Sequence, residues 1–164
     1  MNIKSTFLIA DLHLGHRNIL KYENRPFTTL QEQDEVIISN WNNVVKKEYE
    51  VYVLGDVSFY PKDKTKEILS QLNGRKILVM GNHDRHHSPK YWFNAGFEIV
   101  SKYPICLTEY NLWLSHEPMF MDDNTVYKNI CGHQHSKGIE NCVSVELINY
   151  TPVRLDKKIN INNY

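Results

Sequence analysis

The feature that most constrains the fold is the tetrapeptide Gly-Asn-His-Asp at residues 81–84, which directly follows the apolar run at 77–80. A continuous aliphatic run of this kind is typical of a strand buried on both faces. In open α/β sheets, ligands bind in the crevice beyond the carboxyl ends of the strands. The pattern therefore places a carboxamide, an imidazole and a carboxylate where the chemistry of such a sheet usually takes place.

Two earlier apolar runs also end in polar residues. The run at 7–10 leads into Asp11-Leu12-His13, and the run at 51–54 leads into Gly55-Asp56. Alternate residues of an extended chain point to the same side, so we expect Asp11 and His13 to face one point. Three such strands, separated by helical segments, predict parallel pairing with right-handed crossovers and an α/β fold.

The segments between these strands carry helical patterns. Thr29 and Glu32 form a capping box, and we expect the helix that follows to extend to about Lys47 with its apolar face against the sheet. Asp63 is the expected N-cap of a second, shorter helix that ends at Asn73-Gly74.

After Pro89 the pattern changes to closely spaced strands. Residues 91–97 predict a short helix or turn, and residues 99–114 predict two strands joined near Tyr110-Asn111. Further strands are expected at 127–131 and 142–147. We therefore expect a second sheet packed on the first, within a single domain that covers residues 1–164.

The charge balance limits the classes of partner. Nineteen basic residues match nineteen acidic ones, giving a formal net charge of zero. Proteins that hold long duplex nucleic acid usually have a basic surplus, so that partner is disfavoured. A small phosphorylated substrate or a short nucleic-acid phosphodiester is compatible with this charge.

The three cysteines and the apolar segments bear on the compartment. No pair has the C-x-x-C spacing and three cannot all pair within one chain, which favours reduced thiols. No apolar run has the length of a signal-peptide core or a membrane span. The expected location is the cytoplasm, with no membrane partner.

Histidines follow apolar runs in the second half of the chain as well. Carboxylate, imidazole and amide groups together suit divalent ions such as Mn, Fe, Co, Ni or Zn better than Ca. Their number exceeds the four ligands of a closed zinc site and suits two adjacent ions that share one carboxylate and a water. The candidate metal ligands are Asp11, His13, Asp56, Asn82, His116, His133 and His135.

The ordered series Asp-x-His, Gly-Asp, Gly-Asn-His-Asp, His and Gly-His-x-His resembles the calcineurin-like metallophosphoesterases, in particular small single-domain bacterial or phage-type members. The resemblance implies a four-layer αββα sandwich of two mixed sheets flanked by helices. It also implies two divalent transition-metal ions, with manganese expected first. The first ion would be held by Asp11, His13, Asp56 and His135, and the second by Asp56, Asn82, His116 and His133.

The hypothesis for the reaction is a phosphodiesterase, in which a hydroxide bridging the two ions attacks phosphorus in line. His83, which is not needed as a ligand, would face the leaving oxygen as general acid or charge-stabilising donor, with Asp84 orienting it. His16, Arg17 and Arg25 lie in a polar loop after the first motif and are candidates for binding the substrate phosphate. The alternative for these three is a solvated loop.

Two other functions remain open from the sequence. A phosphomonoesterase or nucleotidase would use the same centre. A non-catalytic scaffold of the same fold is disfavoured, because such relatives tend to lose the catalytic histidine or several ligands, whereas His83 and all seven ligands are present here. His86 and His87 follow the motif in a polar loop and are expected at the surface.

Overall fold

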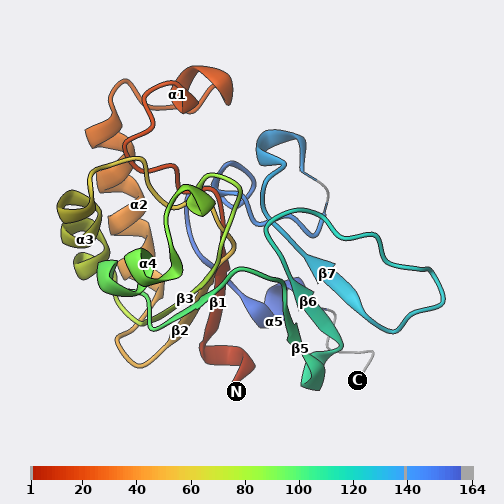
Figure 1. The fold of residues 1–164 in the computed structure, drawn as a ribbon. Helices are drawn as coiled ribbons and strands as arrows, with labels where there is room; N and C mark the ends of the chain where they lie inside the picture. Colours follow the sequence, from red (N-terminus) through yellow and green to blue (C-terminus); the bar gives the residue numbers. More distant parts are fainter. Residues whose placement is uncertain (1, 139, 160–164) are drawn as a thin grey trace.

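A computed structural model of the chain describes residues 2–138 and 140–159. The first sheet has the strand order β4-β3-β2-β1-β8. Figure 1 shows β1, β2 and β3 of this sheet side by side. Its parallel strands are β1 (Thr6–Ile9), β2 (Glu50–Val53), β3 (Arg75–Val79) and β4 (Ile99–Ser101), and β8 (Val153–Arg154) pairs antiparallel with β1. The carboxyl ends of β1, β2 and β3 therefore meet at one edge, which is where a site is expected.

The second sheet has the order β5-β6-β7. It consists of β5 (Ile105–Leu107), β6 (Leu112–Leu114) and β7 (Lys128–Ile130). β6 is antiparallel to β5 and parallel to β7, so both sheets are mixed. Two mixed sheets with flanking helices confirm the predicted fold class.

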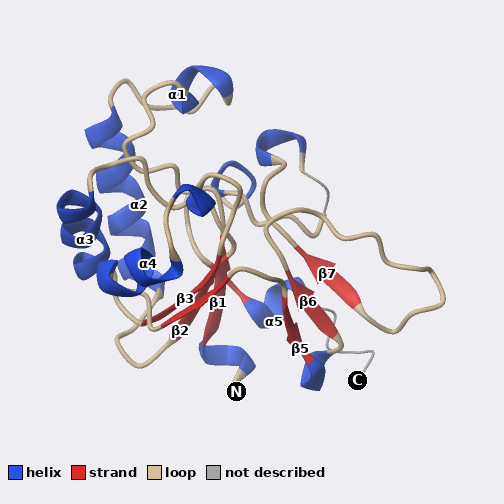
Figure 2. Cartoon of the chain, viewed as in Figure 1, coloured by secondary structure: helices blue, strands red, loops and turns tan. Residues whose placement is uncertain are grey.

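The α-helices are α1 (Ile19–Tyr22), α2 (Leu30–Val44), α3 (Lys62–Gln71), α4 (Pro89–Ala95) and α5 (Leu155–Lys158). Single 3₁₀ turns form η1 (Ile3–Ser5), η2 (Asp84–His86), η3 (Thr108–Tyr110), η4 (His135–Lys137) and η5 (Val145–Leu147). Figure 2 shows α2, α3 and α4 on one side of the first sheet and the second sheet on the other. None of the helices in the described ranges is long and apolar enough to cross a membrane.

The central strands are buried on both faces, as their continuous apolar sequences predict. In β1, Phe7 and Ile9 pack into the core beneath the helices, together with Trp41 of α2. Leu8 belongs to the second core, between the sheets, which also contains Leu114 of β6. Because successive side chains of a strand point to opposite faces of the sheet, β1 contributes side chains to both cores.

The start of α2 follows the sequence closely, but its end does not. Thr29 caps the helix by accepting the N–H of Glu32 at 3.1 Å, whereas the Glu32 carboxylate accepts the N–H of Thr28 instead of that of Thr29. The helix ends at Val44, three residues before the predicted Lys47, because Val45 is extended and turns into the core.

Other element predictions were wrong. Pro61, not Asp63, is the N-cap of α3, and Asp63 lies in its first turn. Residues 99–114 form three strands, because β4 joins the first sheet beside β3. Residues 142–147 make only isolated bridges, one of them between Ser144 and Ala10 just after β1, and the chain then turns into η5.

Candidate metal centre

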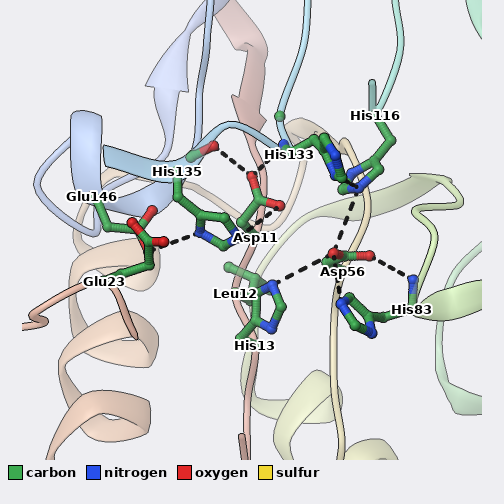
Figure 3. Close-up of polar contacts among 12 residues, drawn as sticks. Asp11, Leu12, His13, Glu23, Asp56, His83, His116, His133, His135 and Glu146 are labelled. Atoms are coloured by element: carbon green, nitrogen blue, oxygen red, sulfur yellow. Dashed lines mark hydrogen bonds and ion pairs between the residues drawn. The ribbon is translucent and has the colours of Figure 1, made fainter. Parts of the chain in front are cut away.

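All seven candidate ligands come from segments that follow strands, and the structure brings them together at one edge of the two sheets. Figure 3 shows Asp11, His13, Asp56, His116, His133 and His135. The first sheet contributes residues after β1, β2 and β3, and the second sheet contributes residues after β6 and β7. Two three-residue groups that could hold a metal ion are made of candidate ligands: Asp11, His13 and His135 on one side, and Asp56, His116 and His133 on the other. A third such group, Glu23, His135 and Glu146, lies behind His135.

The backbone at these residues is unusual. Left-handed φ angles occur at five of the seven candidates, namely Asp11 (59°), His13 (49°), Asp56 (55°), His133 (68°) and His135 (48°). This conformation is unfavourable for residues other than glycine, and it persists where the surrounding structure imposes it, often at functional sites. Asp11 and His13 therefore face the same centre from a turned backbone, which corrects the extended backbone expected from their spacing.

The second group shows convergent lone pairs. His116 Nδ1 donates to the carbonyl oxygen of Leu54 at 2.8 Å, so its Nε2 carries the lone pair. That Nε2 lies 2.8 Å from Asn82 Oδ1, 3.1 Å from His133 Nδ1 and 3.5 Å from Asp56 Oδ2. A proton on His133 Nδ1 would satisfy only some of these atoms. A cation can bind His116, Asn82, His133 and Asp56 at once.

The first group contains buried polar atoms that lack a partner. Asp11 Oδ1 and His13 Nε2 are both buried and accept or donate no hydrogen bond within the described residues. His135 Nε2 lies 4.0 Å from Asp11 Oδ1. Burial of such groups without a partner is costly, and a divalent cation would compensate for it. The residues present thus fit the metal that the predicted ligand set requires.

Asp56 stands between the two groups. Its Oδ2 lies 3.5 Å from His13 Nε2 and 3.5 Å from His116 Nε2. Its Oδ1 accepts the backbone N–H of His83 at 3.0 Å, which fixes the carboxylate plane. One carboxylate therefore faces both groups, as a bridging ligand must.

The pKa shifts of His13 and His116 favour metal binding, since imidazole binds a metal only when neutral, whereas that of Asp11 opposes it. Burial lowers the pKa of His13 to about 4 and also lowers that of His116. Burial raises the pKa of Asp11 to about 8. Burial also opposes ionisation of Asp56, but the neighbouring imidazoles of His13 and His116, each with its Nε2 3.5 Å from Asp56 Oδ2, outweigh it and lower the pKa of Asp56 to about 2.

His135 is held by a buried ion pair behind it. Its Nδ1 lies 3.1 Å from Glu146 Oε1, and Glu146 pairs with Arg25 at 2.6 Å. Burial acts to lower the pKa of His135, but the hydrogen bond to Glu146 and the charge of Asp11 raise it. Carboxylates that receive the second N–H of a metal-binding histidine orient the ring, and Glu146 occupies that place.

Arg25 does not reach toward a substrate. Its side chain is buried and donates to the carbonyl oxygens of Asp11 and Leu12 at 2.8 and 3.0 Å, and to Gln33 Oε1 at 2.7 Å. The expected contact with a substrate phosphate is therefore corrected: these bonds, together with Glu146, occupy the guanidinium and tie down the Asp11–His13 loop.

Asp84 also differs from its expected place. Its carboxylate accepts the backbone N–H groups of Asp56, Val57 and Gly81 at 2.8, 3.0 and 2.8 Å. Burial raises its pKa to about 6. Instead of orienting the His83 ring, this carboxylate joins the segments that follow β2 and β3. A side chain at Gly81 would collide with the Asp56 carboxylate, which explains the glycine there.

His83 and His16 line the open side of the centre. The His83 side chain is 40% exposed, and its Nε2 lies 4.0 Å from Asp56 Oδ2. His16 Nδ1 lies 3.1 Å from His13 Nδ1. Arg17 is exposed on the same loop. His16 is therefore placed at the centre, whereas for Arg17 the structure shows only exposure to solvent.

His86 and His87 lie at the surface, as predicted. Both are exposed, and the His87 ring stacks on Tyr91 with ring centroids 4.0 Å apart.

Three residues at the centre were missed by sequence reasoning. Phe59 stacks on His16 at 4.2 Å and packs against His83 at 5.0 Å, although no motif includes it. Ser144 Oγ donates to Asp11 Oδ2 at 2.5 Å. Ser144 and Glu146 alternate with apolar residues at 143–147, and this pattern was the available signal for both.

Comparison with known proteins identifies one protein family and several similar proteins. Residues 5–158 match the family described as calcineurin-like phosphoesterase. The chain is 35% identical over 174 aligned residues to the uncharacterized protein MJ1445 of Methanocaldococcus jannaschii, covering 95% of this chain and 90% of that one. It is 33% identical over 91 residues to the Gene 66 protein of Mycobacterium phage L5, covering 52% of this chain and 42% of the phage protein. The crystal structure of AQ665, a protein of unknown function from Aquifex aeolicus, gives a TM-score of 0.69 at 27% identity, covering 94% of this chain and 98% of that one.

Proposed function

Because the chain belongs to the calcineurin-like phosphoesterase family, which hydrolyses phosphate esters with the help of metal ions, we propose that it is a phosphodiesterase with a binuclear centre. The proposed substrate is a small phosphodiester or a short nucleic-acid strand. Manganese is the proposed metal, and Fe, Co, Ni and Zn suit the same ligands.

The observation that carries this proposal is the position of Asp56 between two sets of convergent ligands. One set contains the unpartnered atoms of Asp11 and His13, and the other contains the lone pair of His116 beside Asn82. Two cations with a shared carboxylate account for both sets, whereas a single cation would leave one set uncompensated.

Each side chain has a distinct task in the proposed reaction. When bound, the two cations supply charge stabilisation at phosphorus and lower the pKa of water. His83 lies beside the bridging carboxylate with an exposed ring, so it can donate a proton or hydrogen bond to the leaving oxygen. Glu146 orients His135, and Arg25 ties down the loop that carries Asp11 and His13. The Asp84 carboxylate accepts the backbone N–H of Asp56 and so holds that residue in place.

The exposure of the centre favours diesters. His83 and Phe59 are both about two-fifths exposed, and His133 is exposed as well. An open centre leaves room for the second ester group, which a monoester lacks.

A comparison of two aryl substrates tests this preference. We expect the manganese-loaded protein to hydrolyse bis(p-nitrophenyl) phosphate with a higher kcat/KM than p-nitrophenyl phosphate. A higher kcat/KM for the monoester would instead support the phosphomonoesterase alternative. Protein from the same preparation, treated with chelator, controls for contaminating activity.

A further inference from the structure

A hollow with a volume of about 410 Å³ lies beside the proposed centre, next to the carboxyl end of β3. It is lined by Met80, Arg85, His87, Lys102, Tyr103 and Pro104. A smaller hollow of about 200 Å³ shares Arg85, Lys102 and Tyr103 with it and extends to His116. The two hollows share most of the lining of the larger one, and together they are called the groove; the candidate metal ligand His116 is part of the lining of the smaller hollow. The volume of the larger hollow is typical of ligand sites.

The groove carries two cationic side chains from separate segments. Arg85 comes from η2, directly after the 81–84 motif, and Lys102 comes from the link between β4 and β5. Lys102 has no ion-pair partner in the part of the chain that the structure describes. Arg85 lies 3.9 Å from Glu117, and both side chains are more than half exposed, so that pair is weak and exchangeable.

An exposed aromatic ring stands at the same place. Tyr103 is 75% exposed, which is high for a large aromatic side chain. Its backbone is fixed on both sides by Ser101, whose Oγ accepts the N–H of Tyr103 and donates to its carbonyl oxygen at 2.7 Å. A ring presented on a fixed backbone beside two cations is the arrangement that binds single-stranded nucleic acid, through base stacking and phosphate contacts.

We propose that this groove is a subsite for the nucleotide next to the scissile phosphate of a short single strand. Arg85 and Lys102 bind the second phosphate, and Tyr103 stacks on the base. The subsite rests on the proposed function, because its inner end is His116. It narrows the substrate class from phosphodiesters in general to oligonucleotides.

The test measures binding separately from hydrolysis. The probes are thymidine dinucleotides whose internal phosphate is replaced by an uncharged, hydrolysis-resistant methylphosphonate, with or without a terminal phosphate at the 5′ or 3′ end. Calorimetric titration of the full, manganese-loaded chain measures Kd for each probe. The ratio of Kd without the terminal phosphate to Kd with it is the phosphate advantage. We expect the double variant Arg85→Ala, Lys102→Ala to reduce that advantage by roughly tenfold.

Matched controls address charge and stacking. Lys62→Ala with Lys66→Ala removes two exposed charges from α3 and should leave the advantage intact. Tyr103→Leu should weaken binding of both probes, whereas Tyr103→Phe should not. Thermal unfolding of each variant confirms that it is folded.

The outcomes separate the subsite from the reaction. If the protein hydrolyses diesters but the double variant retains the full phosphate advantage, the subsite is wrong and the proposed function stands. If it hydrolyses no phosphate ester while the terminal phosphate still binds through Arg85 and Lys102, the groove stands as a phosphate-binding site, but the proposed function is wrong and so is the placement of the groove next to a scissile phosphate. Equal binding of probes with and without the terminal phosphate also overturns the subsite.

Discussion

Asp11 is the residue at which burial and charge conflict most strongly. Its side chain is fully buried, one oxygen accepts from Ser144 and His133, and the other has no hydrogen-bond partner in the described ranges. Burial raises its pKa from 3.8 to about 8. The metal-free protein therefore binds a proton at Asp11 more tightly than the unfolded chain does, and this contribution to stability is lost as the pH rises through about 8.

A pH dependence of metal binding follows. A divalent cation needs the ionised carboxylate, so it must displace the Asp11 proton below about pH 8. We expect the apparent affinity for Mn²⁺ to fall by about tenfold per pH unit as the pH is lowered from 8 to 6. Calorimetric titrations in buffers of different ionisation enthalpy measure the affinity and the released protons together. No proton release across this range would contradict the assignment of Asp11 as a ligand.

His83 is expected to act on the substrate without binding metal. Its ring lies on the open side of Asp56, and its backbone N–H already holds that carboxylate. We predict that His83→Ala lowers kcat for a diester by about 10²–10⁴-fold, the usual contribution of a positioned general acid. Elemental analysis should find the metal content of the wild type. Loss of metal together with activity would show that His83 is a ligand.

The candidate ligands were identifiable from sequence because each follows an apolar run, so burial and position could be inferred together. The role of Asp84 could not be inferred, because η2 turns its side chain back toward the backbone after β2. Glu146 and Phe59 belong to no motif and reach the centre only through the packing of distant segments.

At the level of elements, the loops after β2 and β3 are joined by one carboxylate. Asp84 accepts three buried backbone N–H groups, and its own carbonyl oxygen accepts Trp92 Nε1 of α4 at 3.0 Å. Residues 81–84, which carry the central motif, are thus fixed both to the loop after β2 and to α4.

Replacing that carboxylate should weaken the fold. Asp84→Asn leaves at least one buried N–H without an acceptor, and we expect it to lower the free energy of unfolding by about 1–3 kcal/mol. Urea unfolding followed by tryptophan fluorescence measures the change. The matched control Asp123→Asn lies in an exposed loop and should change stability by less than about 0.5 kcal/mol. Equal stability of Asp84→Asn and the wild type would show that the backbone needs no such anchor.

The Arg25–Glu146 pair links the first loop, α2 and η5. Its two side chains are 0% and 6% exposed, so removing one partner leaves a buried charge. We expect Arg25→Met to destabilise the protein by about 3–5 kcal/mol.

Combining Arg25→Met with Glu146→Gln separates stability from metal binding. The double variant should recover part of the lost stability, since neither charge of the pair remains, yet bind metal about 10–100-fold more weakly because a neutral amide replaces the carboxylate that orients His135. Competition titration with a metal indicator measures the affinity. Wild-type affinity in the double variant would show that the pair supports the fold alone.

Long buried strands and the capped helix were predictable, because their signals are continuous and local. The short elements were not. β8 has two residues and is defined by pairing with β1, more than a hundred residues away. Residues 142–147 alternate like a strand, but η5 takes up the second half of this segment, where the chain turns and places Glu146.

At the scale of the whole molecule, the centre requires both sheets. Asp11, Asp56 and Asn82 follow strands of the first sheet, and His116 and His133 follow strands of the second. Each sheet alone carries an incomplete set of ligands, and only their packing through the core between them brings the sets together. The order of motifs predicted this convergence, while the left-handed turns that achieve it became visible only in the structure.

The most direct test of the binuclear centre is a crystal structure of the manganese-loaded protein with anomalous difference maps. We predict two peaks about 3.5–4 Å apart on either side of the Asp56 carboxylate. One should lie among Asp11, His13 and His135, and the other among Asn82, His116 and His133. A single peak, or peaks away from Asp56, at saturating manganese would contradict the account.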